Sequence, residues 1–187
     1  DAFGEYTLSD YRMSRLKNLK GKMQRQQSIG AGLLLNYAIQ RLAPGMGIPP
    51  DIVTGKYGKP ELRGGELFFS LSHSKNMAAC AVSDGEIGID IQITSDGSEK
   101  LIKRIFREDE RKYIESHPDR QYAFTELWSL KESYIKARGM GLKIPLSGFS
   151  VFETAGMWHA AAGEFHIGVC SMKYPEVRPD EFKRIEL

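Results

Sequence analysis

Apolar residues recur along the chain at two different spacings. Between residues 24 and 42 they follow the three- and four-residue intervals of an amphipathic helix, which Pro44 and Gly45 would end. The next 20 residues are rich in glycine and proline and predict a loop. Two short apolar runs, 67–72 and 77–82, then predict strands, and turn residues follow the second run.

The pattern from residue 87 onward predicts further strands and helices. Isoleucines alternate with other residues over 87–93, which predicts a half-buried strand with Asp90 on the face opposite the isoleucines. Charged helices are expected at 100–116 and at 123–138, where Gly139 ends the second. Two more strands are expected, at 149–152 and 165–172. The order of helix, strands, helix, helix and strands indicates the α+β class.

One weak internal similarity links residues 78–83 to residues 167–171. Both segments are apolar, strand-like and contain a cysteine, Cys80 or Cys170. Either the chain contains two halves of similar design, or two apolar strands are alike by chance. The segments alone favour chance.

Composition places the chain among ordinary globular proteins. It has 187 residues, of which 41% are hydrophobic and 27% charged. No apolar run approaches the roughly 20 residues that span a bilayer, and no signal peptide is visible after Asp1, so we expect no membrane segment. Neither cysteine lies in a CxxC motif, so both are expected to be buried thiols in a reducing cytoplasm.

The net charge is only +2, but the positive charges are unevenly distributed. Six basic residues occur between residues 12 and 25 without an intervening acid. They are Arg12, Arg15, Lys17, Lys20, Lys22 and Arg25. This stretch indicates either a site for a phosphorylated or acidic partner or a solvated helix face. No aromatic platform or recognition motif accompanies it, so nucleic acid is not expected as a partner.

A few polar residues lie where they could carry chemistry. A carboxylate among isoleucines, as at Asp90, is either exposed on the wet face of a sheet or a ligand for a hard cation. Glu132 and Lys136 share a helix face, as surface decoration or, with Asp90, as a site for Mg²⁺ and a diphosphate. His73 follows a predicted strand, where binding residues often lie, although a lone histidine is more often structural.

Four short motifs occur in a fixed order. They read GKYGKP at 55–60, FSLSHS at 69–74, GIDI at 88–91 and WSLKESYIK at 128–136. In this order and at these separations they resemble the 4′-phosphopantetheinyl transferases, specifically the large, surfactin-synthetase-activating type. The resemblance covers residues 12–172.

The resemblance implies an activity and an architecture. These enzymes move the phosphopantetheine arm of coenzyme A to a serine of an apo acyl or peptidyl carrier protein, and release adenosine 3′,5′-bisphosphate. They need Mg²⁺, or Mn²⁺. It also implies a monomer of two similar α+β halves with the site between them. Residues 1–86 would then bind coenzyme A, and 87–187 would carry the metal and catalytic motifs.

The resemblance also assigns roles to residues. Asp90, Glu132 and Lys136 match catalytic positions, and either Glu132 or a water on the metal would accept the serine proton. The metal ligands would be Asp90, Glu132 and Gln92, where the family often has an acid in place of Gln92. The residues matched to coenzyme A binding are Arg12, Arg15, Ser28, Lys59, Pro60, Ser72 and His73.

Two expectations concern partners. An acidic carrier protein would dock beside the basic segment 100–112, unless the acids of that segment balance its own bases. The alternative to an enzyme is a coenzyme A or carrier-protein binding module that has lost catalysis. Only Gln92 favours that alternative.

Overall fold

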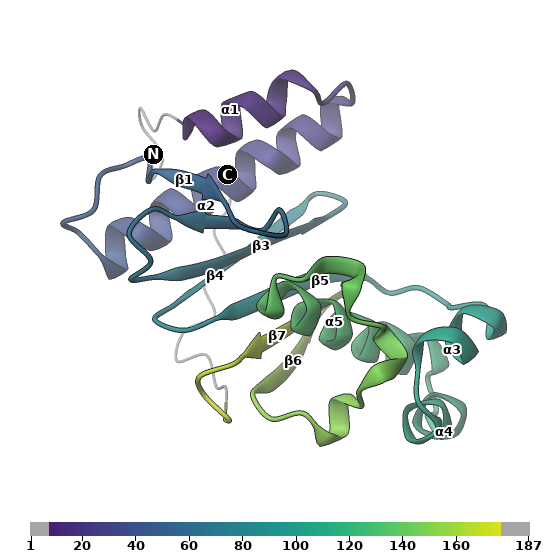
Figure 1. Ribbon diagram of the computed structural model, residues 1–187. Helices are drawn as coiled ribbons and strands as arrows, with labels where there is room; N and C mark the ends of the chain where they lie inside the picture. Colours follow the sequence, from purple (N-terminus) through teal and green to yellow (C-terminus); the bar gives the residue numbers. More distant parts are fainter. Residues whose placement is uncertain (1–7, 177–187) are drawn as a thin grey trace.

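The computed structural model describes residues 8–176, and the chain runs from a helical layer into two groups of strands (Figure 1). We call residues 8–86 the first half and residues 87–176 the second half. The first half contains helices α1 (Asp10–Lys17) and α2 (Lys22–Leu42) and strands β1 (Ile52–Thr54), β2 (Pro60–Leu62), β3 (Phe68–Ser74) and β4 (Met77–Ser83). Strands β1 and β2 form one antiparallel pair, and β3 and β4 form another.

The first half folds around a small core under α2. Leu35 and Ile39 of α2 are buried against Leu62 and Phe69 of the strands. Helix α1 begins at Ser9, whose hydroxyl accepts the backbone N–H of Arg12 and so satisfies one free donor of the first turn. The two helices therefore lie above the strands as one layer (Figure 1).

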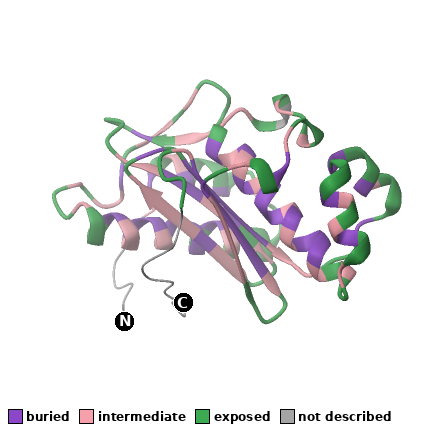
Figure 2. Cartoon of the chain, turned by 90° about the horizontal axis from the view of Figure 1, so that it is seen from below, coloured by how far each residue is buried: buried purple, intermediate pink, exposed green. Residues whose placement is uncertain are grey.

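The second half is a three-stranded antiparallel sheet covered by helices. Its strands lie in the order β5 (Ile87–Ile93), β7 (Phe165–Ser171) and β6 (Met157–Ala162). Its helices are α3 (Glu99–Ile105), α4 (Glu108–Ser116) and α5 (Arg120–Arg138), followed by 3₁₀ turns at Gly141–Lys143, Leu146–Gly148 and Val151–Glu153. Gly139, in the left-handed conformation, ends α5 as predicted. Figure 2 shows how the buried positions of α5 and of these strands face one another.

The halves meet where β5 lies beside β3. The sheets stay separate, and two serine side chains of β3 take the place of a backbone ladder. Ser70 Oγ accepts the N–H of Ile89 at 3.0 Å, and Ser72 Oγ accepts the N–H of Ile91 at 3.2 Å. The isoleucines of β5 pack in one cluster with Ala79 of the first half. The boundary between the halves is thus both hydrogen-bonded and apolar.

The mixed α and β composition is confirmed, and several predicted elements are placed correctly. The predicted helix 100–116 is wrong as a single helix, because the chain breaks after Phe106 and α4 restarts after Arg107, whose backbone N–H is accepted by the Glu110 carboxylate. The predicted strand 149–152 is also wrong, since the chain forms a 3₁₀ turn there. Helix α1 and strands β1, β2 and β6 were not predicted.

The strand expected to be half-buried at 87–93 is buried on both faces over residues 87–91. Residues 87–91 are all buried, because β3 and β4 cover one side of β5 and α5 covers the other. Asp90 is therefore not on a wet face. Within residues 8–176, no helix has the length and apolar character needed to cross a bilayer.

Candidate active site

Asp90 lies at the boundary of the two halves and is 2% exposed. Its Oδ1 accepts hydrogen bonds from Ser72 Oγ at 2.8 Å and from Lys136 Nζ at 2.5 Å. Its Oδ2 accepts one from Gln92 Nε2 at 2.8 Å. Three donors, one of them charged, stabilise the buried carboxylate as an anion.

Two glycines bring the functional face of α5 onto the strands. A Cβ at Gly88 would lie 1.9 Å from the carbonyl oxygen of Ser133, and one at Gly168 would lie 2.5 Å from that of Ser129. Gly168 is the register partner of Asp90. Because neither strand position has a side chain, the α5 backbone rests directly on the sheet. Lys136 of α5 can therefore reach Asp90.

Glu132, one turn before Lys136, is the second carboxylate of the site. Burial raises the pKa of Glu132, and the negative charge of Asp90 raises it further, while the Lys136 ammonium lowers it. The two carboxylates are thus close enough to repel each other electrostatically. A cation between them would relieve this repulsion.

The chemistry of the donors fits a magnesium ion. Mg²⁺ in phosphoryl-transfer sites takes one or two carboxylates and completes its shell with water and substrate phosphates. Asp90 and Glu132 would supply the two carboxylates, and the amide oxygen of Gln92, whose nitrogen donates to Asp90, would be a further oxygen ligand. Among residues 8–176, no group of three or more His, Cys, Asp or Glu side chains is placed to hold a metal ion.

A cluster of positive charge faces the carboxylates from the first half. Burial lowers the pKa of His73, and the nearby charges of Lys136, Arg12 and Arg15 lower it further. Arg12, Arg15 and Lys136 are therefore all near enough to His73 to act on it electrostatically, and Lys136 is the one of them that also pairs with Asp90. Such a region favours a polyanionic ligand.

Arg12 is the most unusual member of this cluster. Its guanidinium is buried and donates to Ser28 Oγ at 3.5 Å, and no carboxylate within residues 8–176 pairs with it. Its Nε has no hydrogen-bond partner among the described residues, and burial lowers the pKa of Arg12. A buried donor without an acceptor costs about 1–3 kcal/mol, which an anion at this position would offset.

The structure brings most of the predicted site residues together. Asp90, Gln92, Glu132, Lys136 and Ser72 form the acidic part, and Arg12, Arg15, Ser28 and His73 form the basic part. Lys59 and Pro60 lie apart from these contacts. Lys59 Nζ donates to the carbonyl oxygens of Ile87 and Ala137, and Pro60 pairs with Thr54 in the β1–β2 sheet. That these two residues contact coenzyme A stays a prediction.

Ser70 is a site-positioning residue that the sequence analysis missed. It is buried and accepts the N–H of the residue just before Asp90. A signal was present, because Ser70 and Ser72 alternate with apolar residues in β3 and so share one face. The sequence does not show that this face meets a strand from the other half.

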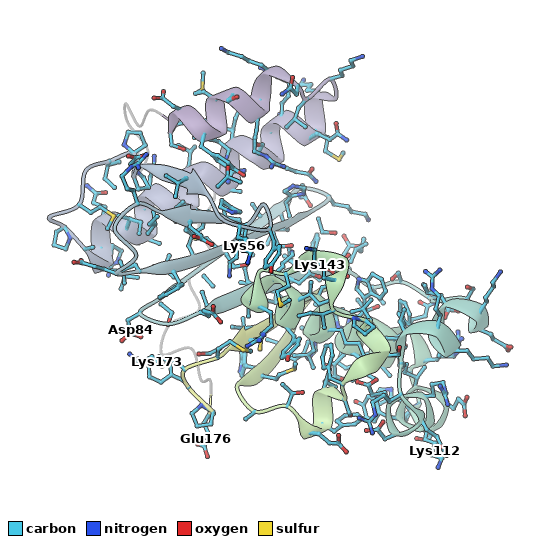
Figure 3. All side chains as sticks on the ribbon, in the orientation of Figure 1. Lys56, Asp84, Lys112, Lys143, Lys173 and Glu176 are labelled. Atoms are coloured by element: carbon cyan, nitrogen blue, oxygen red, sulfur yellow. The ribbon has the colours of Figure 1, made fainter. Side chains whose placement is uncertain are left out.

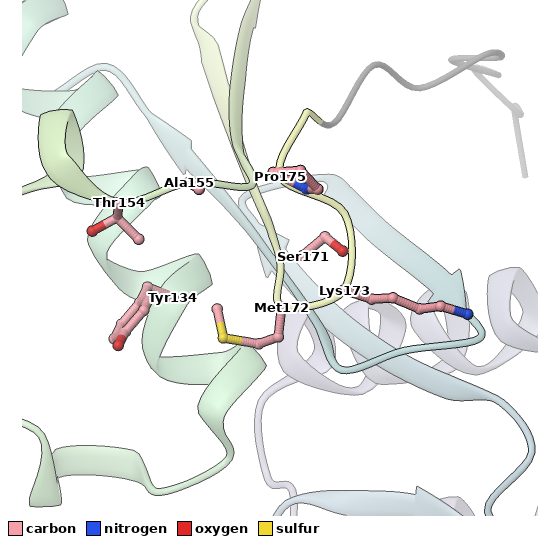
Figure 4. Close-up of a pocket in the computed structure, with 7 residues that line it drawn as sticks. All are labelled: Tyr134, Thr154, Ala155, Ser171, Met172, Lys173 and Pro175. Atoms are coloured by element: carbon pink, nitrogen blue, oxygen red, sulfur yellow. The ribbon is translucent and has the colours of Figure 1, made fainter.

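One hollow of the second half lies away from these residues. A cavity of about 290 Å³ is lined by Tyr134, Thr154, Ala155, Ser171, Met172, Lys173 and Pro175 (Figure 4). Tyr134 and Met172 extend toward it, whereas the Lys173 ammonium points away and pairs with Asp84. No residue of the Asp90 cluster lines this cavity, so it does not form part of the candidate site.

Comparisons with known proteins agree with the motifs. Residues 86–167 match the model of the 4′-phosphopantetheinyl transferase superfamily. A 4′-phosphopantetheinyl transferase of Bacillus subtilis is 42% identical over 99 residues, which are 51% of this chain and 44% of the relative. The 4′-phosphopantetheinyl transferase Sfp of Bacillus subtilis strain 168 is 39% identical over 101 residues, 52% of this chain and 45% of the relative.

These relatives are longer than the matched region. The chain spans about half the length of the curated relatives it matches. The crystal structure of Thermotoga maritima holo-[acyl-carrier-protein] synthase is 21% identical and covers 45% of this chain and 60% of that one, with a TM-score of 0.34, too low to support an argument about the fold. The sequence comparisons confirm the resemblance to 4′-phosphopantetheinyl transferases of the Sfp type.

Proposed function

We propose that this protein transfers the 4′-phosphopantetheine group of coenzyme A to a serine of an apo carrier protein. The observation that carries the proposal is the meeting of two opposite charge clusters at the boundary of the halves. Lys136 acts on both, because it pairs with Asp90 and its charge also lowers the pKa of His73. The diphosphate of coenzyme A needs cations around it. Transfer of the phosphopantetheine group to a serine also needs a base that accepts the serine proton.

The basic cluster would hold the phosphates of coenzyme A. Among the described residues Arg12 has a free buried donor, and Arg15 adds positive charge nearby. His73, whose pKa is lowered, would contribute a neutral ring that can donate one hydrogen bond. Ser28 supplies a hydroxyl next to the Arg12 guanidinium. Charge-assisted hydrogen bonds to phosphate are the strong kind, so these residues would fix the diphosphate in position.

The acidic cluster would handle the proton and the developing charge. The carrier serine oxygen forms a bond to the phosphorus that bears pantetheine, and the bond from that phosphorus to adenosine 3′,5′-bisphosphate breaks. Glu132 would accept the serine proton, because its raised pKa makes it a better base than an ordinary carboxylate. Lys136 would stabilise negative charge on the phosphates from its place beside Asp90.

Asp90, Glu132 and Gln92 would hold Mg²⁺ or Mn²⁺. The bound ion neutralises charge on the diphosphate during transfer. Ser72 and Lys136 orient the Asp90 carboxylate through the hydrogen bonds to its Oδ1. With Gln92 in place of an acid, the site has one negative charge fewer and is expected to bind the metal more weakly.

Mass spectrometry of an apo carrier protein tests the proposal. The carrier is incubated with the protein, coenzyme A and Mg²⁺, and a mass gain of one phosphopantetheine is expected. The matched control is Asp90→Asn, which should give no gain at the same enzyme concentration. Coenzyme A binding by calorimetry without any mass gain would contradict transfer and identify a non-catalytic binding module.

The carrier docking surface is proposed to lie on α3. Lys100, Lys103 and Arg104 of this region form no ion pair with another described residue. In α4, by contrast, Lys112 pairs with Glu108 at 2.7 Å. The free positive charge of α3 would attract an acidic carrier, mostly by speeding its association at low salt.

Charge reversal tests whether the carrier docks on α3 and not on α4. The double variant Lys103→Glu and Arg104→Glu should raise the KM for the carrier at low salt and leave the KM for coenzyme A unchanged. Lys112→Glu, on the paired helix, is the control and should have a smaller effect. An unchanged carrier KM for the double variant would move the docking surface away from α3.

The remaining proposals concern assembly and compartment. We infer a monomer whose two halves are similar in design, because each half lays one long helix, α2 or α5, on antiparallel strands. Strands β3 and β4 follow α2 in the sequence, and β6 and β7 follow α5, whereas β5 precedes α5. Both cysteines are free thiols, and burial raises the pKa of Cys80 and of Cys170 to about 12. Unreactive buried thiols suit a reducing cytoplasm.

A further inference from the structure

The ammonium group of Lys59 joins three elements that lie far apart in the sequence. Its Nζ donates to the carbonyl oxygen of Ile87 at 3.1 Å and to that of Ala137 at 3.0 Å. Ile87 is the first residue of β5, which carries Asp90. Ala137 lies in the last turn of α5, next to Lys136. One lysine of the first half therefore holds one end of each element that builds the acidic cluster.

Lys59 completes the cap of α5. The last carbonyls of a helix have no partner within the helix and form its negative end. The N–H of Gly139 is donated to the carbonyls of Ile135 and Lys136. The carbonyl of Ala137 is bonded instead by the Lys59 ammonium, a cation at the favourable end of the helix dipole.

The surroundings of Lys59 are shaped for this contact. Burial lowers the pKa of Lys59, and the carboxylates of Glu86 and Glu61 oppose that shift and favour the charged form. A Cβ at Gly139 would come within 2.9 Å of Lys59 Cδ, so a residue without a side chain leaves room for the lysine stem. The positive φ of 63° at this position also favours glycine.

A second contact of the same loop reaches the chain just beyond α5. Lys143 Nζ lies 4.3 Å from the ring centre of Tyr57, two residues before Lys59. Lys56, the neighbour of Tyr57, lies near Lys143 at the boundary of the halves (Figure 3). The loop 55–59 thus contacts the second half at two separate points, a cation–π contact and the Lys59 hydrogen bonds.

We propose that the Lys59 ammonium is a positioning group, which fixes the end of α5 that carries Lys136 against the strand that carries Asp90. This rests on the proposed transfer of phosphopantetheine. In this role Lys59 touches neither the substrate nor the reacting atoms. It differs from the phosphate or coenzyme A contact that the sequence motif predicts for this residue.

The two roles predict different kinetics. Lys59→Met keeps the aliphatic stem beside Gly139 and removes the ammonium group. Because misplacement of catalytic groups by about 1 Å can cost 10²-fold in rate, we expect kcat for carrier modification to fall tenfold to a hundredfold, with the Kd of coenzyme A nearly unchanged. In Lys59→Met, hydrogen exchange of the backbone amides of residues 136–143 should become faster. Lys56→Met, in the same loop but exposed, is the control and should leave kcat, Kd and exchange unchanged.

Three results would overturn the proposal. The first is a Kd for coenzyme A that rises tenfold or more while kcat is kept, which would make Lys59 a ligand contact. The second is unchanged kcat and unchanged exchange. The third is an equal effect of Lys56→Met. If Lys59→Met does not fold, Lys59→Gln, which retains an N–H donor, is measured by the same criteria. If the unmodified protein transfers nothing, the proposed function fails, but the exchange measurement still tests the contact.

Discussion

The two halves of the molecule use glycine for close approach in different ways. In the second half, the α5 backbone rests on the backbone of β5 and β7 at Gly88 and Gly168. In the first half, the close approach at Gly32 of α2 is to side chains. A Cβ there would lie 2.7 Å from Leu8 Cδ2 and 3.4 Å from Arg12 Cγ. The second half is thus built around a rigid backbone contact, and the first half around a contact that side-chain motion can relax.

The charged groups of the two halves also differ in how completely they are hydrogen-bonded. The second half holds its functional groups in a saturated network, where Asp90 has three hydrogen-bond donors. In the described part of the first half, Arg12 is buried with its Nε donor unpartnered and pairs with no carboxylate. A saturated network keeps its geometry before substrate arrives, whereas an unsatisfied cation is stabilised only when a ligand binds. The catalytic groups and the binding groups therefore differ in what their removal should change.

The largest effect is expected from the saturated network. Asp90→Asn keeps the size of the side chain but removes the charge that Lys136 and Ser72 bond to. Transfer should fall about 10²–10³-fold, as for other preorganised electrostatic groups, and Mn²⁺ binding should weaken. Single-turnover transfer and Mn²⁺ titration measure the two effects. Asp84→Asn, an exposed carboxylate paired with Lys173, is the control. If the folded Asp90→Asn variant transfers phosphopantetheine at the wild-type rate, Asp90 does not belong to the active site.

Two glycine substitutions test the difference between the backbone contacts. Gly168→Ala places a methyl group 2.5 Å from the Ser129 backbone, which cannot move without displacing α5. We expect a loss of about 1–3 kcal/mol in the free energy of unfolding, typical of overpacking. Gly32→Ala should cost less, because the Leu8 side chain can shift and alanine favours the helix by about 1 kcal/mol. Urea denaturation compares the two, and an equal loss would contradict the distinction.

The long periodic elements could be predicted from the sequence, and the short ones could not. Helices α2 and α5 and strands β3, β4, β5 and β7 have several turns or alternations each, so their patterns are clear. Strands β1 and β2 have three residues each and lie in a stretch rich in glycine and proline. At the break between α3 and α4 the Glu110 carboxylate accepts the backbone N–H of Arg107, and the surrounding charged residues do not distinguish this contact from ordinary surface charge.

Site residues could be identified in the sequence, but their contacts could not. The motifs marked Asp90, Glu132 and Lys136 correctly as members of one cluster. The burial of Asp90 depends on β3, which packs from the other half, and no local pattern reveals such a contact. The same holds for Lys59, whose two carbonyl partners lie 28 and 78 residues away in the chain.

The unsatisfied cation of the first half gives the third prediction. Arg12→Met should weaken coenzyme A binding by tenfold or more, because a hydrogen bond to a charged group is worth about 1.5–3 kcal/mol. Its stability should be equal or higher, since the variant removes a buried donor that has no partner. Calorimetry and thermal unfolding measure the two effects. Lys17→Met, exposed in the same helix, is the control. A large loss of stability with unchanged binding would make Arg12 structural.

The smallest effect concerns pH and a buried histidine pair of the second half. His159 Nε2 lies 3.1 Å from His166 Nδ1, and His166 Nε2 lies 3.2 Å from Thr94 Oγ1. Burial lowers the pKa of His159 to about 4, and burial together with His159 lowers the pKa of His166. His159 Nδ1 also lies 3.4 Å from Glu126, whose other oxygen accepts the Tyr113 hydroxyl. At neutral pH this contact is a hydrogen bond from a neutral ring rather than an ion pair.

Because the pKa values of His159 and His166 are lowered in the folded protein, acidification should reduce the free energy of unfolding. Below the ordinary histidine pKa of about 6.5 the unfolded chain binds protons that the folded pair does not, so stability is fully present above that pH and is lost on acidification toward 4. We expect the unfolding midpoint to fall by several degrees between pH 7 and pH 4.5, since 1 kcal/mol corresponds to about 2–4 °C in a chain of this size. His159→Gln should flatten this dependence, whereas His117→Gln, at the end of α4, should leave it in place. The negative charges near the pair, Glu126 and Asp119, oppose the shift at His166, so a slope that persists unchanged in His159→Gln would assign the acid sensitivity to other groups.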